Sequence, residues 1–152
     1  MALKPDRQEV YSDIRYFMNE TGERGCIVIA DTSVSGLGGL DDAGSVVKKP
    51  TDSGGAPIGM LMNDVVNVDL SRYRLNEQKD EVQMGSKVDV MRRGGARTNM
   101  IPAGINPING SGAYYTTGGL LTTTNNGGNS LVGRWASSKD EDGFAYVEIN
   151  LP

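Results

Sequence analysis

The stretch from Leu131 to Leu151, LVGRWASSKDEDGFAYVEINL, decides the fold class. In its second half, Phe144, Tyr146 and Glu148 alternate with the apolar residues at positions 145, 147 and 149. Alternation with a period of two is typical of a β-strand that buries one face. The polar turn KDEDG at positions 139–143 separates this strand from the apolar run that begins at Leu131. The stretch therefore predicts a β-hairpin.

The same succession of short strands and glycine turns fills the chain from Pro57 onward. The turn Thr117–Gly119 predicts a second hairpin, and Arg93–Ala96 predicts a turn between two strands. Strands spaced about ten residues apart, with glycine turns between them, indicate a small antiparallel barrel or sandwich. The expected strands cover residues 58–70, 87–92, 97–101, 113–115, 120–123, 131–137 and 144–151, with a short strand or turn at 80–85.

The first 56 residues have a different pattern. Asp6 and Glu9 have the spacing of a helical capping box, but Ile14, Tyr16 and Met18 also alternate as in a strand, so both structures stay open for residues 1–25. Residues 26–30 predict a short buried strand, and residues 33–57 predict a long glycine-rich loop. We therefore expect an N-terminal arm, strand and loop over residues 1–56, and a barrel domain over 57–152. The arm either covers the protein's own core or binds a partner.

The composition excludes several function classes. The 152 residues include no histidine and one cysteine, so histidine-based catalysis, an internal disulfide and a thiolate zinc site are all absent. With 15 basic and 19 acidic residues the net charge is −4, which disfavours direct binding of nucleic acid. No apolar run is long enough to span a membrane, and the N-terminus does not resemble a signal peptide. We expect synthesis in the cytoplasm, with no membrane partner.

No motif predicts a catalytic or cofactor site. The Gly36–Gly38 motif lacks the strand and helix of a dinucleotide fold, and the acidic loop at 139–143 lacks the final glutamate of a calcium loop. The arginine–glycine segment 92–97 is better explained as a hairpin tip than as a site for single-stranded nucleic acid. Trp135 with the tyrosines at 114 and 115 could stack on sugars, although a single Trp is more often core. We therefore expect no enzyme, metal or cofactor, and keep a carbohydrate-binding module or hydrolase on a β-barrel as the alternative.

An ordered set of short motifs between Pro57 and Pro152 resembles the small β-barrel head decoration, or cement, proteins of tailed bacteriophages. The resemblance implies a mainly β fold, a small antiparallel barrel of the β-tulip or SH3-like kind. The motifs are PIGML at 57–61, NDVVNVDL at 63–70, KDEVQMGSKV at 79–88, GAYY at 112–115, GGLLTT at 118–123, LVGRW at 131–135 and DGFA at 142–145.

This resemblance implies a structural virion protein. Such a protein binds the outer surface of the capsid, cements neighbouring subunits of the major capsid protein and stabilises the expanded head. Its partners would be the major capsid protein and copies of itself, as a trimer or alternatively a dimer; a tail or baseplate structural protein is a further alternative. We expect capsid or subunit contacts from the arm residues Leu3, Pro5, Tyr11, Ile14, Tyr16 and Phe17 and from the loop residues Leu37, Leu40, Val46 and Val47.

Overall fold

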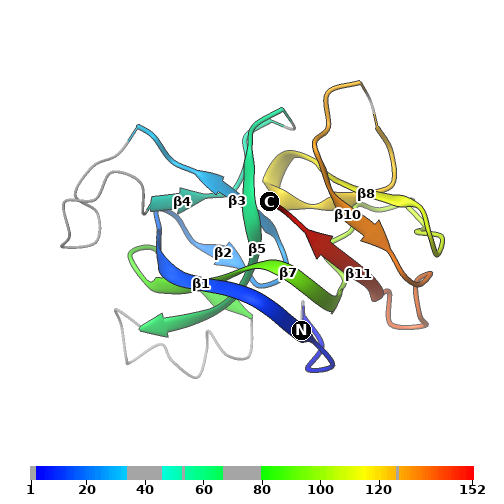
Figure 1. The fold of residues 1–152 in the computed structure, drawn as a ribbon, viewed down its shortest axis with the longest axis horizontal. Coiled ribbons are helices and arrows are strands. Elements are labelled where there is room, and N and C mark those ends of the chain that lie inside the picture. Colours follow the sequence, from blue (N-terminus) through cyan, green and yellow to red (C-terminus); the bar gives the residue numbers. More distant parts are fainter. Residues whose placement is uncertain (1–2, 34–45, 53, 67–79, 126) are drawn as a thin grey trace.

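The structure, a computed structural model, describes residues 3–33, 46–52, 54–66, 80–125 and 127–152 (Figure 1). These residues contain β-strands, one short 3₁₀ turn at Thr117–Gly119 and no α-helix. The strands are β1 (Gln8–Met18), β2 (Gly22–Glu23), β3 (Ile27–Ala30), β4 (Val46–Lys48), β5 (Pro57–Val66), β6 (Glu81–Val82), β7 (Lys87–Thr98), β8 (Gly112–Tyr115), β9 (Leu121–Thr122), β10 (Leu131–Trp135) and β11 (Ala145–Asn150).

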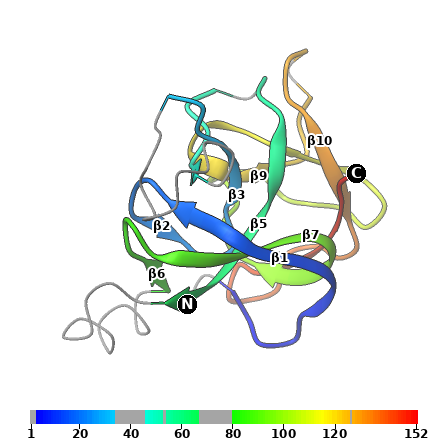
Figure 2. The same cartoon turned by 60° about the vertical axis from the view of Figure 1, so that its left-hand side comes forward.

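Five strands close into a barrel. They follow the order β1–β4–β3–β5–β7, and β7 pairs back with β1, whose crossing against β7 is visible in Figure 2. Strands β1 and β4 run parallel, with Phe17 opposite Val46, while the other barrel pairs are antiparallel. The predicted small, mainly β barrel is confirmed.

Strand β7 connects this barrel to a second part of the sheet. Along one edge, β7 pairs first with β5 and then with β11; along the other edge it pairs with β1. From β11 the sheet continues through β10, β8 and β9, which lie on the right of Figure 1. One twelve-residue strand is thus shared by the barrel and by the outer strands.

Two hydrophobic cores lie on the two sides of β3, β5 and β7. Alternation places Val28 of β3 in the barrel core and Ile27 in the outer core; Leu61 and Met60 of β5 divide in the same way. Because both faces of β3 are covered, its sequence IVIA is a continuous apolar run. The barrel core consists of Tyr16, Met18, Cys26, Val28, Val47, Leu61, Val82, Val88 and Val90. The outer core includes Leu3, Met91, Ile101, Tyr115, Leu121, Val132, Trp135, Val147, Ile149 and Leu151.

The N-terminal segment is extended, so the strand alternative for residues 1–25 is the right one. Leu3 bridges Thr98 and the amide of Lys4 donates to the carbonyl of Arg97, so the segment follows β7 even before β1 begins. The predicted strand at residues 26–30 and the hairpins around residues 117–119 and 139–143 are also confirmed. The part of the predicted strand 58–70 beyond residue 66 lies outside the described residues.

Two local predictions are wrong. Residues 93–96 form no turn or hairpin tip, because β7 runs through them without interruption. Their glycines mark close approaches: a Cβ on Gly94, whose φ is +143°, would meet the carbonyl oxygen of Gln8, and one on Gly95 would overlap the Tyr146 hydroxyl. Within the predicted loop 33–57, β4 is a buried strand of the barrel.

Strands from both predicted parts of the chain lie in one sheet. Residues before position 56 supply β1, β3 and β4, three of the five barrel strands. The change of sequence pattern near residue 56 thus occurs between β4 and β5, two barrel strands that follow each other in the chain. Whether residues 57–152 fold alone stays a prediction.

Candidate interaction surface

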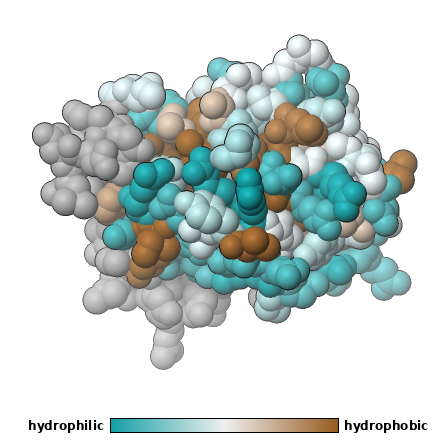
Figure 3. Space-filling model, viewed as in Figure 1, coloured by the Kyte–Doolittle hydropathy of each residue, from teal (hydrophilic) through white to brown (hydrophobic). Residues whose placement is uncertain are grey.

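A shallow groove of about 450 Å³ lies between the middle of β1, the middle of β7 and the C-terminal residues. Its lining combines apolar and cationic side chains: Val10, Tyr11, Arg92, Arg93, Leu151 and Pro152. Val10 and Tyr11 are 70% and 51% exposed, so two adjacent large apolar side chains face solvent here. On the face seen in Figure 3, apolar side chains otherwise form separate patches between hydrophilic ones.

Two facing β-bulges build this groove. Glu9 pairs with Gly94 and Tyr11 with Arg93, so Val10 is an extra residue on β1. Tyr11 pairs with Arg93 and Ser12 with Met91, so the residue at position 92 is in turn extra on β7. A bulge breaks the alternation of side chains between the two faces. Consecutive residues of each strand can therefore line the same groove.

Within the described part of the chain, the side chains of the two groove arginines have no acidic partner. Arg92 and Arg93 form no ion pair there, and the buried Nε of Arg92 has no hydrogen-bond acceptor. Other cations are paired: Arg7 Nε lies 2.9 Å from Glu9 Oε1, and Arg134 Nε lies 2.7 Å from Glu148 Oε2. No side-chain carboxylate lines the groove. It is therefore an apolar surface with two arginines that no lining side-chain carboxylate neutralises.

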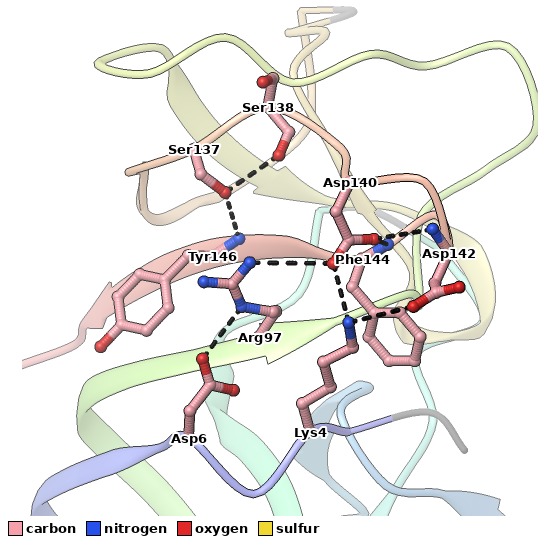
Figure 4. A network of polar contacts seen from close by, with 9 residues as sticks. All are labelled: Lys4, Asp6, Arg97, Ser137, Ser138, Asp140, Asp142, Phe144 and Tyr146. Atoms are coloured by element: carbon pink, nitrogen blue, oxygen red, sulfur yellow. Dashed lines mark hydrogen bonds and ion pairs between the residues drawn. The ribbon is translucent and has the colours of Figure 1, made fainter.

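A polar network fixes the segment before β1 at the other end of the molecule (Figure 4). Lys4 Nζ lies 2.8 Å from Asp140 Oδ2 and 3.4 Å from Asp142 Oδ2, and 4.6 Å from the centre of the Phe144 ring. Arg97 Nε donates to Asp6 Oδ2 over 3.0 Å. The hydrogen bond from Lys4 lowers the pKa of Asp140, and the same bond raises the pKa of Lys4. The acidic loop thus binds a side chain of its own chain.

Chemistry typical of an enzyme finds no support in the described residues. Cys26 is fully buried, and desolvation raises the pKa of its thiol to about 12, so it is not a nucleophile. Trp135 and Tyr115 are fully buried core residues and form no sugar-stacking platform. The described residues hold no group of three or more His, Cys, Asp or Glu placed to bind a metal. In the same residues, no helix has the length and apolar character needed to cross a membrane.

Comparison with known proteins now decides the family. The model of the structural cement protein family, described as E217 gp24/Pam3 gp6, matches residues 11–150. The chain belongs to this phage cement protein family. No curated protein matches the chain. The resemblance seen in the sequence is confirmed, and the family description gives the protein a structural cementing role in a phage.

The expected contact residues of this cement protein divide into two groups. Tyr11 and Ile14 are exposed on β1, Pro5 is exposed and Phe17 is half-buried, so these four are accessible to a partner. Leu3, Tyr16, Val46 and Val47 instead pack in the protein's own cores or lie buried beside them. Leu37 and Leu40 lie outside the described residues. The contact role of the accessible group stays a prediction.

Sequence reasoning missed most of the groove of this cement protein. The sequence predicts a hairpin tip at the arginines 92 and 93 and the end of a strand at Leu151. The groove depends on a one-residue shift of register on each of two strands that are about 80 residues apart in the chain. No local pattern records such a shift, although two adjacent arginines before two glycines were a visible departure from strict alternation.

Proposed function

We propose that this cement protein binds the outer surface of the phage capsid and holds neighbouring subunits of the major capsid protein together, stabilising the expanded head. The observation that carries this proposal is the match to the structural cement family over residues 11–150. The fold agrees with a structural role, because both faces of the central strands are buried and the N-terminal segment is fastened along β7. Such a body can transmit load between subunits without changing shape.

Stabilisation of the head by a bound cement protein follows from mass action. A ligand that binds only the assembled, expanded lattice stabilises that lattice by an amount that grows with its concentration and affinity. No covalent step is required, which suits a chain whose described residues show no catalytic arrangement. On the capsid we expect the copies to contact each other as trimers, with dimers as the alternative, as the resemblance implies.

The experiment uses expanded heads purified without this protein. Adding the purified protein should saturate a fixed number of sites and raise the temperature at which heads release their contents, with head diameter unchanged by cryo-electron microscopy. Unexpanded heads and isolated tails are the controls, and neither should bind. Identical melting of bare and saturated heads, or binding to tails alone, would overturn the capsid role; the latter would favour the tail or baseplate alternative.

A further inference from the structure

The groove between β1 and β7 has the chemistry of a site for a specific kind of peptide. We propose that it receives an extended segment of a capsid subunit that carries one acidic side chain between apolar ones, and that Arg92 and Arg93 bind its carboxylate. This inference rests on the proposed function, because the capsid is the source of the segment. The groove's volume of about 450 Å³ falls within the usual range of ligand sites.

Electrostatics favours a carboxylate as the anchor. The guanidinium group presents donors that match a carboxylate in geometry, and a charged hydrogen bond is stronger than a neutral one. The Nε of Arg92 is already withdrawn from water without an acceptor, which costs free energy in the unbound protein. A bound carboxylate would supply acceptors for the guanidinium groups that line the groove. Positive charge concentrated at this groove is notable in a chain whose net charge is −4.

The apolar walls account for the rest of the segment. Val10 and Tyr11 form one side, and Leu151 and Pro152 contribute the end of the groove. Burying apolar surface against these residues adds affinity but does not orient the bound segment. The arginines fix its position. An acidic residue with apolar neighbours satisfies both parts of the groove.

The bulges also argue against the simplest alternative, the addition of a partner strand to the free edge of β1. Strand addition needs a regular row of backbone donors and acceptors, and bulges interrupt that row. Register shifts occur at three places along β1, between residues 9 and 11, 11 and 12, and 13 and 16. Recognition through side chains in the groove is therefore favoured over backbone pairing.

A second copy of this chain is a less suitable occupant. Its most acidic described loop, at residues 139–143, uses Asp140 and Asp142 to bind Lys4 of its own chain. The carboxylate of Glu148 likewise pairs with Arg134. These groups would have to leave existing partners to enter the groove of a neighbour.

Charge variants test the arginines. Arg93→Glu and Arg92→Gln are compared with the wild type for binding to expanded heads by co-sedimentation, at low and high salt. We expect each variant to bind at least about tenfold more weakly, with a smaller salt dependence. Arg134→Glu, at an exposed arginine outside the groove, is the matched control and should bind like the wild type. Unchanged melting temperatures of the free variants exclude misfolding.

A crosslinking experiment identifies the occupant. Tyr11→p-benzoylphenylalanine places a photoreactive group in the groove wall, and mass spectrometry of irradiated decorated heads locates the crosslinked residues. A crosslink to a capsid segment that contains Asp or Glu beside apolar residues supports the inference. A crosslink to a second copy, or groove variants that bind like the wild type, would refute it while leaving the capsid role intact. Failure of the wild type itself to bind heads would refute both.

Discussion

Lys4 Nζ lies 2.8 Å from Asp140 Oδ2, so an ion pair joins residues 136 positions apart in the chain. Lys4 precedes β1 and Asp140 lies in the loop between β10 and β11. The pair therefore fastens the N-terminal segment to the hairpin near the other end of the chain. Asp140 also accepts hydrogen bonds from the amides of Asp142 and Phe144, which holds the loop in position to receive the lysine.

Removing this lysine should release the N-terminal segment locally. In Lys4→Met the amide of residue 4, which donates to the Arg97 carbonyl, should exchange with deuterium faster than in the wild type. Amides of β5 and of the first half of β7 should be unaffected. Hydrogen exchange measured by mass spectrometry checks this. Equal exchange at residue 4 in both proteins would show that backbone pairing alone holds the segment.

Two tyrosines on the same strand should differ sharply in their effect on stability. Tyr16 is 3% exposed in the barrel core, whereas Tyr11 is 51% exposed. Tyr16→Ala should lower the free energy of unfolding by about 3–5 kcal/mol, as for other large aromatic truncations. Tyr11→Ala should change it by no more than about 0.5 kcal/mol. Urea denaturation of both variants provides the comparison, and similar losses would mean that Tyr11 is buried in solution.

Deletion of residues 2–21 tests whether the predicted arm is separate from the barrel. The deletion removes β1, with the core side chains Tyr16 and Met18, and opens the barrel between β4 and β7. We expect the remaining chain to lose its cooperative thermal transition. A shorter deletion of residues 2–5, which spares β1, is the control and should still unfold cooperatively. A cooperative β protein after the longer deletion would show that residues 22–152 need no support from β1.

Local sequence patterns predict most of the fold, and the predictions that were wrong have physical causes. The hairpin around residues 139–143 was predictable because both of its strands alternate and the turn is polar. The helix signal of Asp6 and Glu9 failed because tertiary pairing of β1 with β7 overrides capping. Tyr16 and Met18 enter the barrel core, whereas a register shift between Asp13 and Tyr16 leaves Ile14 exposed. The glycines at 94 and 95 were mistaken for a turn. Glycine is favoured both in turns and where neighbouring strands approach closely, so the residue type alone does not distinguish the two.

The candidate site was less accessible to prediction than the fold. Apolar and aromatic content drew attention to β1, where Tyr11 and Ile14 are exposed, and their contact role stays a prediction. Burial of Val46 and Val47 depends on β4 pairing with β1 and β3, which are distant in sequence. The groove depends on bulges whose position is set by the relative register of β1 and β7. Register across strands far apart is a property of the whole sheet, so single-sequence reasoning does not supply it.

Glycine 133 should be intolerant of any side chain. A Cβ at Gly133 would collide with the backbone carbonyl oxygen of Glu148, on the paired strand β11. Gly133→Ala should therefore lower the free energy of unfolding by about 1–3 kcal/mol. Gly128, around which nothing lies within 4 Å, offers the control Gly128→Ala, which should be near neutral. Chemical denaturation of the two variants measures the difference, and equal stabilities would contradict the close approach of β10 and β11.

Asp31 should make stability depend on pH in a narrow acidic range. Hydrogen bonds, chiefly from the Ser33 hydroxyl at 2.6 Å and also from Asn19 and Lys48, lower the pKa of this buried carboxyl from 3.8 to about 2. A pKa that is lower in the folded than in the unfolded state contributes stability above the unfolded value, and the contribution is lost as the pH falls. Asp31→Asn should cost about 1–3 kcal/mol at neutral pH. Denaturation between pH 7 and 2 should show this gap closing below about pH 4, and a constant gap would assign the effect to packing.

The placement of β1 and β11 on β7 also determines how the protein resists mechanical force. Both strands run antiparallel to β7, and therefore parallel to each other, so a pull applied at Gln8 and Asn150 acts along the strand axes in opposite directions. In this shear geometry the inter-strand hydrogen bonds, which lie perpendicular to the strands, bear load simultaneously instead of opening one after another. Internal pressure on a shell would reach the protein as tension. Stretching from these two positions in an optical trap should give a higher rupture force than peeling β9 from the opposite end of the sheet.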